Sequence, residues 1–146
     1  MTTINATRTM KTIKATKGEL VNLINGLYQV QEVKGKDFSL IVSKNISTLH
    51  EALKEIEKVG TPSEEFLKLA GEVNEIANKG EENAKEVIEQ LEKENEELVT
   101  ARREQMDKVL NMMKEEVSVK LQLLSENDLP EDITAKQINS LEKILE

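Results

Sequence analysis

The stretch EENAKEVIEQLEKENEELVTARREQMDKVLNMMKEEV, Glu81–Val117, is the part of the chain that decides the predicted fold. Its 37 residues contain no proline and no glycine and are rich in Glu, Lys and Leu, which favour helix formation. Apolar residues recur at three- and four-residue steps near both ends, whereas Glu92–Glu97 and Thr100–Gln105 offer almost nothing to bury. At about 1.5 Å per residue, the pattern predicts one acidic helix of about 55 Å with a polar middle.

Asn95 lies in the polar middle of this stretch. A heptad pattern through Ile88, Leu91, Leu98 and Val109 places it at a core-type position, where a buried asparagine would set register and oligomeric state. Two alternatives remain open. Either the apolar stripe lapses through the polar middle, or the chain folds back near Asn95 as a hairpin, although no glycine or proline marks a turn there.

Composition indicates a helical protein with an aliphatic core. The chain has 146 residues, of which 38% are hydrophobic, 2% aromatic and 33% charged, and we expect a single domain, 1–146, with residues 1–8 flexible. The absence of cysteine excludes disulfides and thiol chemistry. No run of 18 apolar residues occurs, and the start lacks the apolar core of a secretory signal, so we expect no membrane association.

Two short segments depart from helical periodicity. Met10–Ala15 and Val117–Leu123 alternate apolar and polar residues, which is typical of strands. A single short strand needs a partner, so the two segments are predicted to pair as a small two-stranded sheet. The predicted fold is therefore mainly α, a helical bundle with one long acidic helix over 81–117 and this sheet.

Local signals place the ends of the other helices. Capping boxes are predicted at Thr16 with Glu19 and at Thr134 with Gln137. Asp37 is expected to cap the second helix, which ends at Val59-Gly60, and Thr61 to cap a third that runs to Lys79-Gly80. Gly26 within the first helix predicts a close approach by another element.

Charge is distributed unevenly along the chain. The first 45 residues carry seven basic and three acidic residues, a net charge of +4. The rest of the chain therefore carries a net charge of −12, because the total is −8. This asymmetry predicts a site for a small anionic ligand. Its candidate residues are Arg8, Lys11, Lys14, Lys17, Lys34 and Lys36. The alternative is that these are ordinary solvated side chains.

No sequence motif indicates a particular enzymatic reaction. His50 is the only histidine and has no carboxylate three or four residues away to orient it. The carboxylates lie in runs typical of solvated helix faces, and no glycine pattern resembles a phosphate loop. We therefore predict no enzymatic activity, no catalytic or metal-binding residue and no cofactor. The acidic balance and scarce aromatics also argue against nucleic-acid binding.

The long helix is predicted to form an interface between copies of the chain. A helix of about 55 Å exceeds what the shorter helices can cover, and an antiparallel second copy would bury its apolar ends. Arg102 and Arg103 would then approach the partner's glutamates around Glu92–Glu97. The predicted interface comprises Leu91, Asn95, Leu98, Arg102, Val109, Leu110 and Met113.

Several short motifs carry a resemblance to a known family. They are Glu19-Leu20-Val21-Asn22-Leu23-Ile24, Lys44-Asn45-Ile46, Asp128-Leu129-Pro130 and the run from Ile133 to Glu142. Together with the strand-like start and the long acidic helix, they are similar to a family of small, functionally uncharacterised helical proteins of tailed bacteriophages. The resemblance implies a phage source, and thus the host cytoplasm or the virion, and supplies no functional residues.

Two functions from different classes follow as expectations. The first is a non-enzymatic interaction protein, a helical homo-oligomer that binds a phage or host protein and is associated with the virion or its assembly. The second is an anti-defence protein that sequesters an anionic nucleotide signal or docks on a host defence protein.

The capping box of the last helix provides a direct test of the local predictions. Replacing Thr134 with alanine removes the hydroxyl that accepts from the Gln137 N–H, and such N-caps contribute about 1 kcal/mol. We expect a lower melting temperature and reduced helicity, measured by circular dichroism. Unchanged values for both would contradict the cap.

Overall fold

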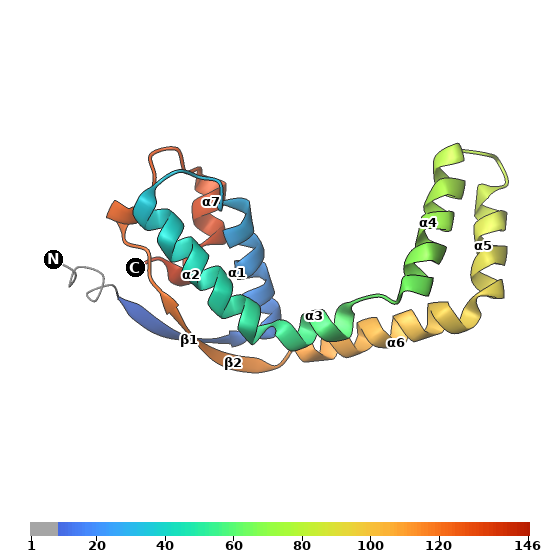
Figure 1. Cartoon of the computed structure of the whole chain (residues 1–146), viewed down its shortest axis with the longest axis horizontal. Helices are drawn as coiled ribbons and strands as arrows, with labels where there is room; N and C mark the ends of the chain where they lie inside the picture. Colours follow the sequence, from blue (N-terminus) through green and yellow to red (C-terminus); the bar gives the residue numbers. More distant parts are fainter. Residues whose placement is uncertain (1–8) are drawn as a thin grey trace. The chain divides into compact units, whose positions relative to one another are not determined.

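The computed structural model of the chain describes residues 9–146 and is mainly helical with one small sheet (Figure 1). The predicted fold class is therefore confirmed. The predicted flexibility of residues 1–8 concerns residues outside the described part. The elements are β1 (Met10–Thr16), α1 (Lys17–Gln29), α2 (Lys36–Ala52), α3 (Lys54–Gly60), α4 (Glu64–Lys79), α5 (Ala84–Glu94), α6 (Glu96–Met113), β2 (Glu116–Gln122), η2 (Glu126–Asp128), α7 (Ala135–Ser140) and η3 (Glu142–Ile144).

Contacts between residues group the chain into two compact units. Unit 1 comprises the described residues through Glu55 together with Met112–Glu146, and unit 2 comprises Ile56–Asn111. The single domain expected from the chain length stays a prediction. Each unit has its own pattern of burial and is described separately.

The sheet of unit 1 joins two segments that are far apart in the sequence. β1 and β2 pair antiparallel, with Met10 opposite Gln122 and Thr16 opposite Glu116, which confirms the predicted pairing. The buried residues Ile13 and Ala15 alternate with exposed residues along β1, because successive side chains of a strand point to opposite faces. The sheet thus buries one face.

Helices α1 and α2 lie on this buried face, and α7 packs beside α1 (Figure 1). Where α1 meets α7, a Cβ atom on Gly26 would come within 3.0 Å of Ser140, so this glycine permits the predicted close approach. The core of unit 1 is aliphatic apart from one phenylalanine. Its largest fully buried apolar side chains are Leu20, Leu27, Val30, Phe38, Ile41, Val42, Leu49, Leu121, Leu124, Leu141 and Ile144.

Asn45 is the one buried polar residue among those described. Its Nδ2 donates to the carbonyl of Gln122 at 2.9 Å, and the Gln122 N–H donates to its Oδ1 at 2.9 Å. The side-chain amide therefore takes the place of a neighbouring strand at the end of β2. This paired contact ties α2 to the sheet at a defined register.

The helix ends show which local predictions hold. Both predicted capping boxes form, with Thr16 and Glu19 at α1 and with Thr134 and Gln137 at α7. Two predicted caps are wrong. Gly35, with φ of 148°, precedes α2 in place of Asp37, which lies inside the first turn. Ser63 caps α4 by accepting from the Phe66 N–H, whereas the Thr61 hydroxyl donates backward to the Glu57 carbonyl and so belongs to the end of α3.

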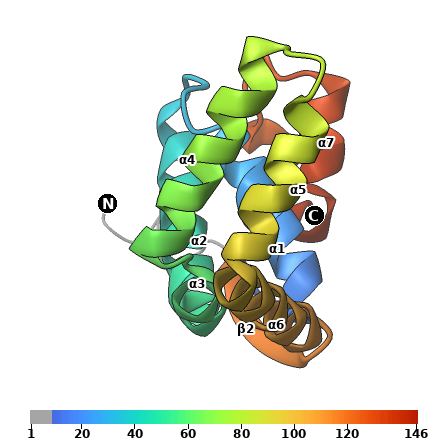
Figure 2. The ribbon, with the colours of Figure 1, turned by 90° about the vertical axis from the view of Figure 1, so that its right-hand side faces the viewer.

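The prediction of one continuous helix over 81–117 is wrong, as the elements of unit 2 show. Gly80 adopts a left-handed conformation, φ 65°, and ends α4, and α5 begins only at Ala84. The helical path is interrupted at Asn95, and α6 ends at Met113, before β2. In Figure 2, α4 and α5 run side by side as a helical pair, whereas α6 continues in a different direction.

The interruption at Asn95 has a local cause. Its side-chain Nδ2 donates to the Leu91 carbonyl at 2.9 Å, so the side chain competes with the backbone for an acceptor that a continuous helix needs. The flanking glutamates bury nothing that would hold the helix straight. Asn95 is half-buried at the junction of α5 and α6, and the chain turns there without forming a hairpin of the two helices.

The contact of Asn45 with Gln122 predicts a large effect of removing the amide. Asn45→Leu leaves the backbone N–H and carbonyl of the half-buried Gln122 without their Asn45 partners, which should lower the free energy of unfolding by about 2 kcal/mol. Urea unfolding measures this. Ser47→Ala, at an exposed position of the same helix, is the control and should change stability by less than about 0.5 kcal/mol. Equal effects of the two variants would contradict the role of Asn45.

Candidate functional site

The side of α6 that carries Arg102 contacts other residues of unit 2. Arg102 Nη1 donates to the Gly60 carbonyl and to Gln105 Oε1, both at 2.8 Å. Its guanidinium lies 5.6 Å from the ring centroid of Phe66, a cation–π contact. Arg102 is therefore occupied within its own chain, which leaves it less available to clamp a partner's carboxylates as the sequence predicted.

Gln105 and Val109 extend this internal contact by one and two turns. Gln105 Nε2 donates to the carbonyls of Val59 and Thr61, at 2.6 and 2.7 Å, and so satisfies acceptors where α3 ends. Val109 is buried, 4% exposed, and a Cβ atom on Gly60 would come within 3.3 Å of its side chain. This side of α6 holds α3 and the residues after it.

Another side of α6 is open. Met106 and Leu110 are four residues apart and therefore share a helix face, and Leu110 is 54% exposed, in contrast to its neighbour Val109. Arg103, three residues before Met106, is also exposed. We call Arg103, Met106 and Leu110 the outer α6 surface.

The seven predicted interface residues do not share one surface. Leu110 is exposed on the outer α6 surface, and Val109 is buried. Leu91 and Leu98 are half-buried on different helices, separated by the interruption at Asn95, and Met113 is half-buried at the end of α6. A straight antiparallel pairing along 81–117 therefore lacks the continuous stripe on which it was based, and an interface role for these residues stays a prediction.

The helical pair α4–α5 carries a shallow groove. Its volume is about 360 Å³, and apolar side chains of Ile76, Val87 and Leu91 line it together with the carboxylates of Glu86 and Glu94. None of the residues of α5 is fully buried. Unit 2 as a whole contains 15 acidic and 8 basic residues, a net −7 of the chain's total −8. Its surface is therefore both acidic and interrupted by apolar side chains.

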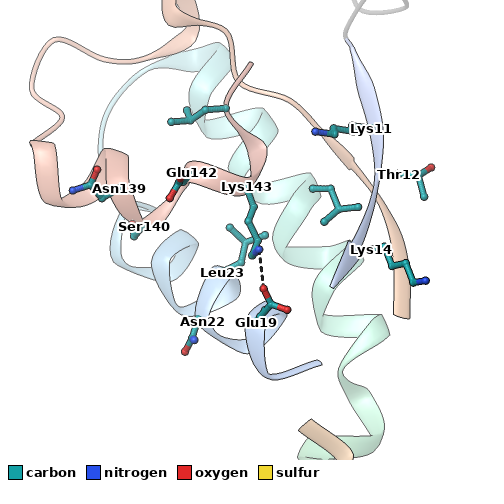
Figure 3. A pocket seen from close by; sticks show the side chains of 12 residues that line it. Lys11, Thr12, Lys14, Glu19, Asn22, Leu23, Asn139, Ser140, Glu142 and Lys143 are labelled. Atoms are coloured by element: carbon teal, nitrogen blue, oxygen red, sulfur yellow. Dashed lines mark ion pairs between the residues drawn. The ribbon is translucent and has the colours of Figure 1, made fainter. Parts of the chain in front are cut away.

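Unit 1 has a larger hollow beside β1, which we call the β1 groove (Figure 3). Its volume is about 730 Å³. Lys11 extends from β1 over the groove, whereas Thr12 and Lys14 point to the other side of the strand. The lining residues are Lys11, Thr12, Ile13, Lys14, Glu19, Asn22, Leu23, Asn139, Ser140, Glu142, Lys143 and Leu145.

The predicted anion-binding residues are only partly brought together. Lys11 and Lys14 line the β1 groove, but Lys14 pairs with Glu116 at 3.4 Å. Lys17 pairs with Glu115 at 2.8 Å. Lys34 and Lys36 lie just before α2 and at its first residue and do not line the groove, and Arg8 lies outside the described residues.

Sequence reasoning missed Lys143, which the fold brings to the same groove from the C-terminal segment. Its Nζ lies 3.0 Å from Glu19 Oε2. The backbone N–H of Thr16 donates to the other oxygen of Glu19, and this bond, together with Lys143, lowers the pKa of Glu19 below its ordinary value of 4.5. Nothing in the spacing of Glu19 and Lys143 indicates that they meet.

The described residues contain no arrangement of groups typical of a metal centre. Between residues 9 and 146, no three His, Cys, Asp or Glu side chains are placed to hold a metal ion. His50 is exposed on α2. No helix in this part of the chain is long and apolar enough to cross a membrane.

Comparison of the chain with protein-family models, with curated proteins and with solved structures found no match. The proposals below therefore rest on the residues and contacts of this chain.

The lowered pKa of Glu19 predicts a pH-dependent contribution to stability. The carboxylate stabilises the folded state fully above its unfolded-state pKa, near 4.5, and this contribution is lost as pH falls through the lower folded-state value. Glu19→Gln keeps an acceptor for the cap but removes the charge. We expect the melting temperature of the wild type to exceed that of Glu19→Gln at neutral pH.

The difference between the two melting temperatures should shrink as pH is lowered well below 4.5. Glu126→Gln, at an exposed position of η2, is the control for removal of one negative charge. A difference that is independent of pH would contradict the coupling of Glu19 to Thr16 and Lys143.

Proposed function

We propose that this chain is a non-enzymatic interaction protein that self-associates and binds protein partners through unit 2. The observation that carries the proposal is the contrast in burial between the two units. Unit 2 buries only the apolar residues Ile56, Leu69 and Val109. Large apolar side chains that it leaves exposed are Leu67, Val87, Met106 and Leu110.

Exposed apolar groups in a strongly charged unit favour a binding role. A single exposed leucine is ordinary, but an apolar patch rimmed by polar groups is typical of an interaction surface. Val87 lines the α4–α5 groove, and Leu110 and Met106 share the outer α6 surface. Burial of these side chains against another chain would supply the hydrophobic free energy that the unit does not obtain internally.

The outer α6 surface is the best candidate for contact between two copies. Like charges oppose self-association, and α6 is closer to neutral than α5. It carries four acidic and three basic residues over its length, whereas the shorter α5 carries four acidic and two basic residues. A two-fold contact through α6 would bury Met106 and Leu110 of both copies.

The alternative function, sequestration of an anionic nucleotide signal, receives less support. The basic residues proposed for it are dispersed, and Lys14 and Lys17 already face carboxylates. The β1 groove is lined by three lysines and two glutamates, a net charge of +1, which suits a single carboxylate but not a multiply charged nucleotide.

The biological setting is proposed from the resemblance to tailed-phage proteins alone. A place in the virion or its assembly, with a phage or host protein as partner, is one form of the proposal, and an early anti-defence role is the other. Mass spectrometry of purified virions distinguishes them, because only a structural or packaged protein is present there.

The self-association predicts a mass that depends on Leu110. Light scattering at tens of micromolar protein should give a multiple of the 16.5 kDa chain mass. Leu110→Glu places a charge in the proposed contact and should return the mass toward that of one chain. The matched control is Asn111→Glu, which adds the same charge at the next, already polar and exposed position and should leave the multiple intact. A wild-type mass near 16.5 kDa would contradict the proposed self-association.

A further inference from the structure

The outer edge of β1 presents backbone groups that face away from β2. Both backbone groups of Gln122 are bonded to Asn45, so the pair of Gln122 with Met10 is a non-hydrogen-bonded pair of the ladder. Such pairs alternate with hydrogen-bonded pairs in an antiparallel ladder. Thr12 and Lys14 are therefore of the same kind as Met10, and their N–H and carbonyl groups point outward.

The bonds at both ends of the ladder agree with this register. The Leu123 N–H donates to the Thr9 carbonyl at 2.9 Å, and the Lys17 N–H donates to the Glu115 carbonyl at 2.8 Å. The odd-numbered residues of β1 thus face β2 with their backbone groups, and the even-numbered residues face away.

The outward groups of Thr12 and Lys14 have no partner among the described residues. At Thr16, the last outward position of β1, the N–H is bonded to Glu19 Oε1 at 3.1 Å. At Gln122, the outward groups of β2 are bonded to Asn45. No hydrogen bond within residues 9–146 engages the backbone of Thr12 or Lys14 on the outer side. The edge is therefore open at Thr12 and Lys14, in the middle of β1.

The β1 groove runs along this open edge. Four consecutive residues of β1, from Lys11 to Lys14, line it, and no residue of β2 does. Its opposite wall comes from α1 and from residues 139–145, as Figure 3 shows. Leu23 and Leu145 give this wall apolar groups. A strand added to a sheet lies about 4.8 Å from its neighbour, so an extended chain beside β1 would lie within the groove.

We propose that the β1 groove binds an extended peptide segment of another protein, which adds to β1 as a third strand. Alternate residues of such a strand point to one face, so its apolar side chains would contact Leu23 and Leu145 at every second position. The backbone bonds would form with Thr12 and Lys14. This proposal goes beyond the role of unit 2, because it concerns a different surface and a different mode of recognition.

The charges of the groove indicate an acidic group in the peptide. Lys14 and Lys143 are paired with Glu116 and Glu19, whereas no ion pair within residues 9–146 engages Lys11. A carboxylate of the peptide beside Lys11 would form an ion pair with its ammonium group. Because α1 and residues 139–145 wall the groove opposite β1, a separate peptide strand fits it better than the β1 edge of a second copy, which carries its own sheet and helices.

A selection experiment tests the proposal without knowledge of the natural partner. A library of random displayed peptides is selected on the full chain, the enriched peptides are synthesised with a fluorescent label, and binding is measured by anisotropy. We expect peptides with apolar residues at alternate positions and an Asp or Glu, and we expect Lys11→Ala to weaken their binding.

Thr12→Pro is the decisive variant, because it removes an N–H that points away from β2 and so spares the ladder. It should weaken peptide binding by about tenfold or more, the scale of one lost hydrogen bond. Thr12→Val keeps the N–H and should bind like the wild type. Binding that is unaffected by Thr12→Pro would overturn the proposal, as would failure to enrich any peptide.

Two measurements on the unaltered chain guard against misfolding of the proline variant. The first is a scan of single backbone N-methyl groups along the peptide. Methylation at every second residue should abolish binding and methylation at the residues between should not, because only alternate N–H groups of the peptide face β1. Hydrogen exchange should show Thr12 and Lys14 amides that are fast in the free chain and protected with peptide. An N-methylation effect without alternation, or concentration-dependent protection in the free chain, which indicates a second copy on this edge, contradicts the proposal.

Discussion

The pairing of β1 with β2 brings together segments that are about 100 residues apart in the sequence, and the core of unit 1 is built on the face that this sheet buries. The entropy cost of closing a long loop grows slowly with its length, so a long intervening segment is tolerated. Two short strands are marginal by themselves. The helices that cover Ile13 and Ala15, and the amide of Asn45 bonded to Gln122, supply what the sheet lacks.

Polar side chains form hydrogen bonds with backbone groups at several ends of strands and helices. Asn45 bonds both backbone groups of Gln122, Gln105 bonds carbonyls at the end of α3, and the Asn95 side chain bonds the Leu91 carbonyl alongside the Asn95 backbone N–H. Because a buried backbone group without a partner is costly, these contacts stabilise the end of β2, the end of α3 and the junction of α5 with α6. The outer edge of β1 at Thr12 is an exception, and it is the edge that borders the β1 groove.

The two units divide burial and charge unequally. Unit 1 holds most of the fully buried apolar side chains, whereas unit 2 holds most of the net negative charge and leaves Leu67 and Leu110 exposed. A unit with few buried contacts gains little stability from its own packing. The same feature makes its apolar side chains available to another chain, which connects the energetics of unit 2 to the interaction role proposed for it.

The sequence by itself determined the features that depend on neighbouring residues: the alternation of both strands and the capping boxes at Thr16 and Thr134. A capping bond spans only three residues, and strand alternation is a property of the backbone, so both are legible in a local pattern. Only the tertiary structure decided that the predicted long helix is interrupted at Asn95, that Lys143 meets Glu19, and that the predicted interface residues lie on separate surfaces. The meeting of Lys143 with Glu19 and the separation of the interface residues depend on distant groups, which no spacing along the chain records. The interruption at Asn95 depends on a local competition for the Leu91 carbonyl, whose outcome the residue pattern alone left open.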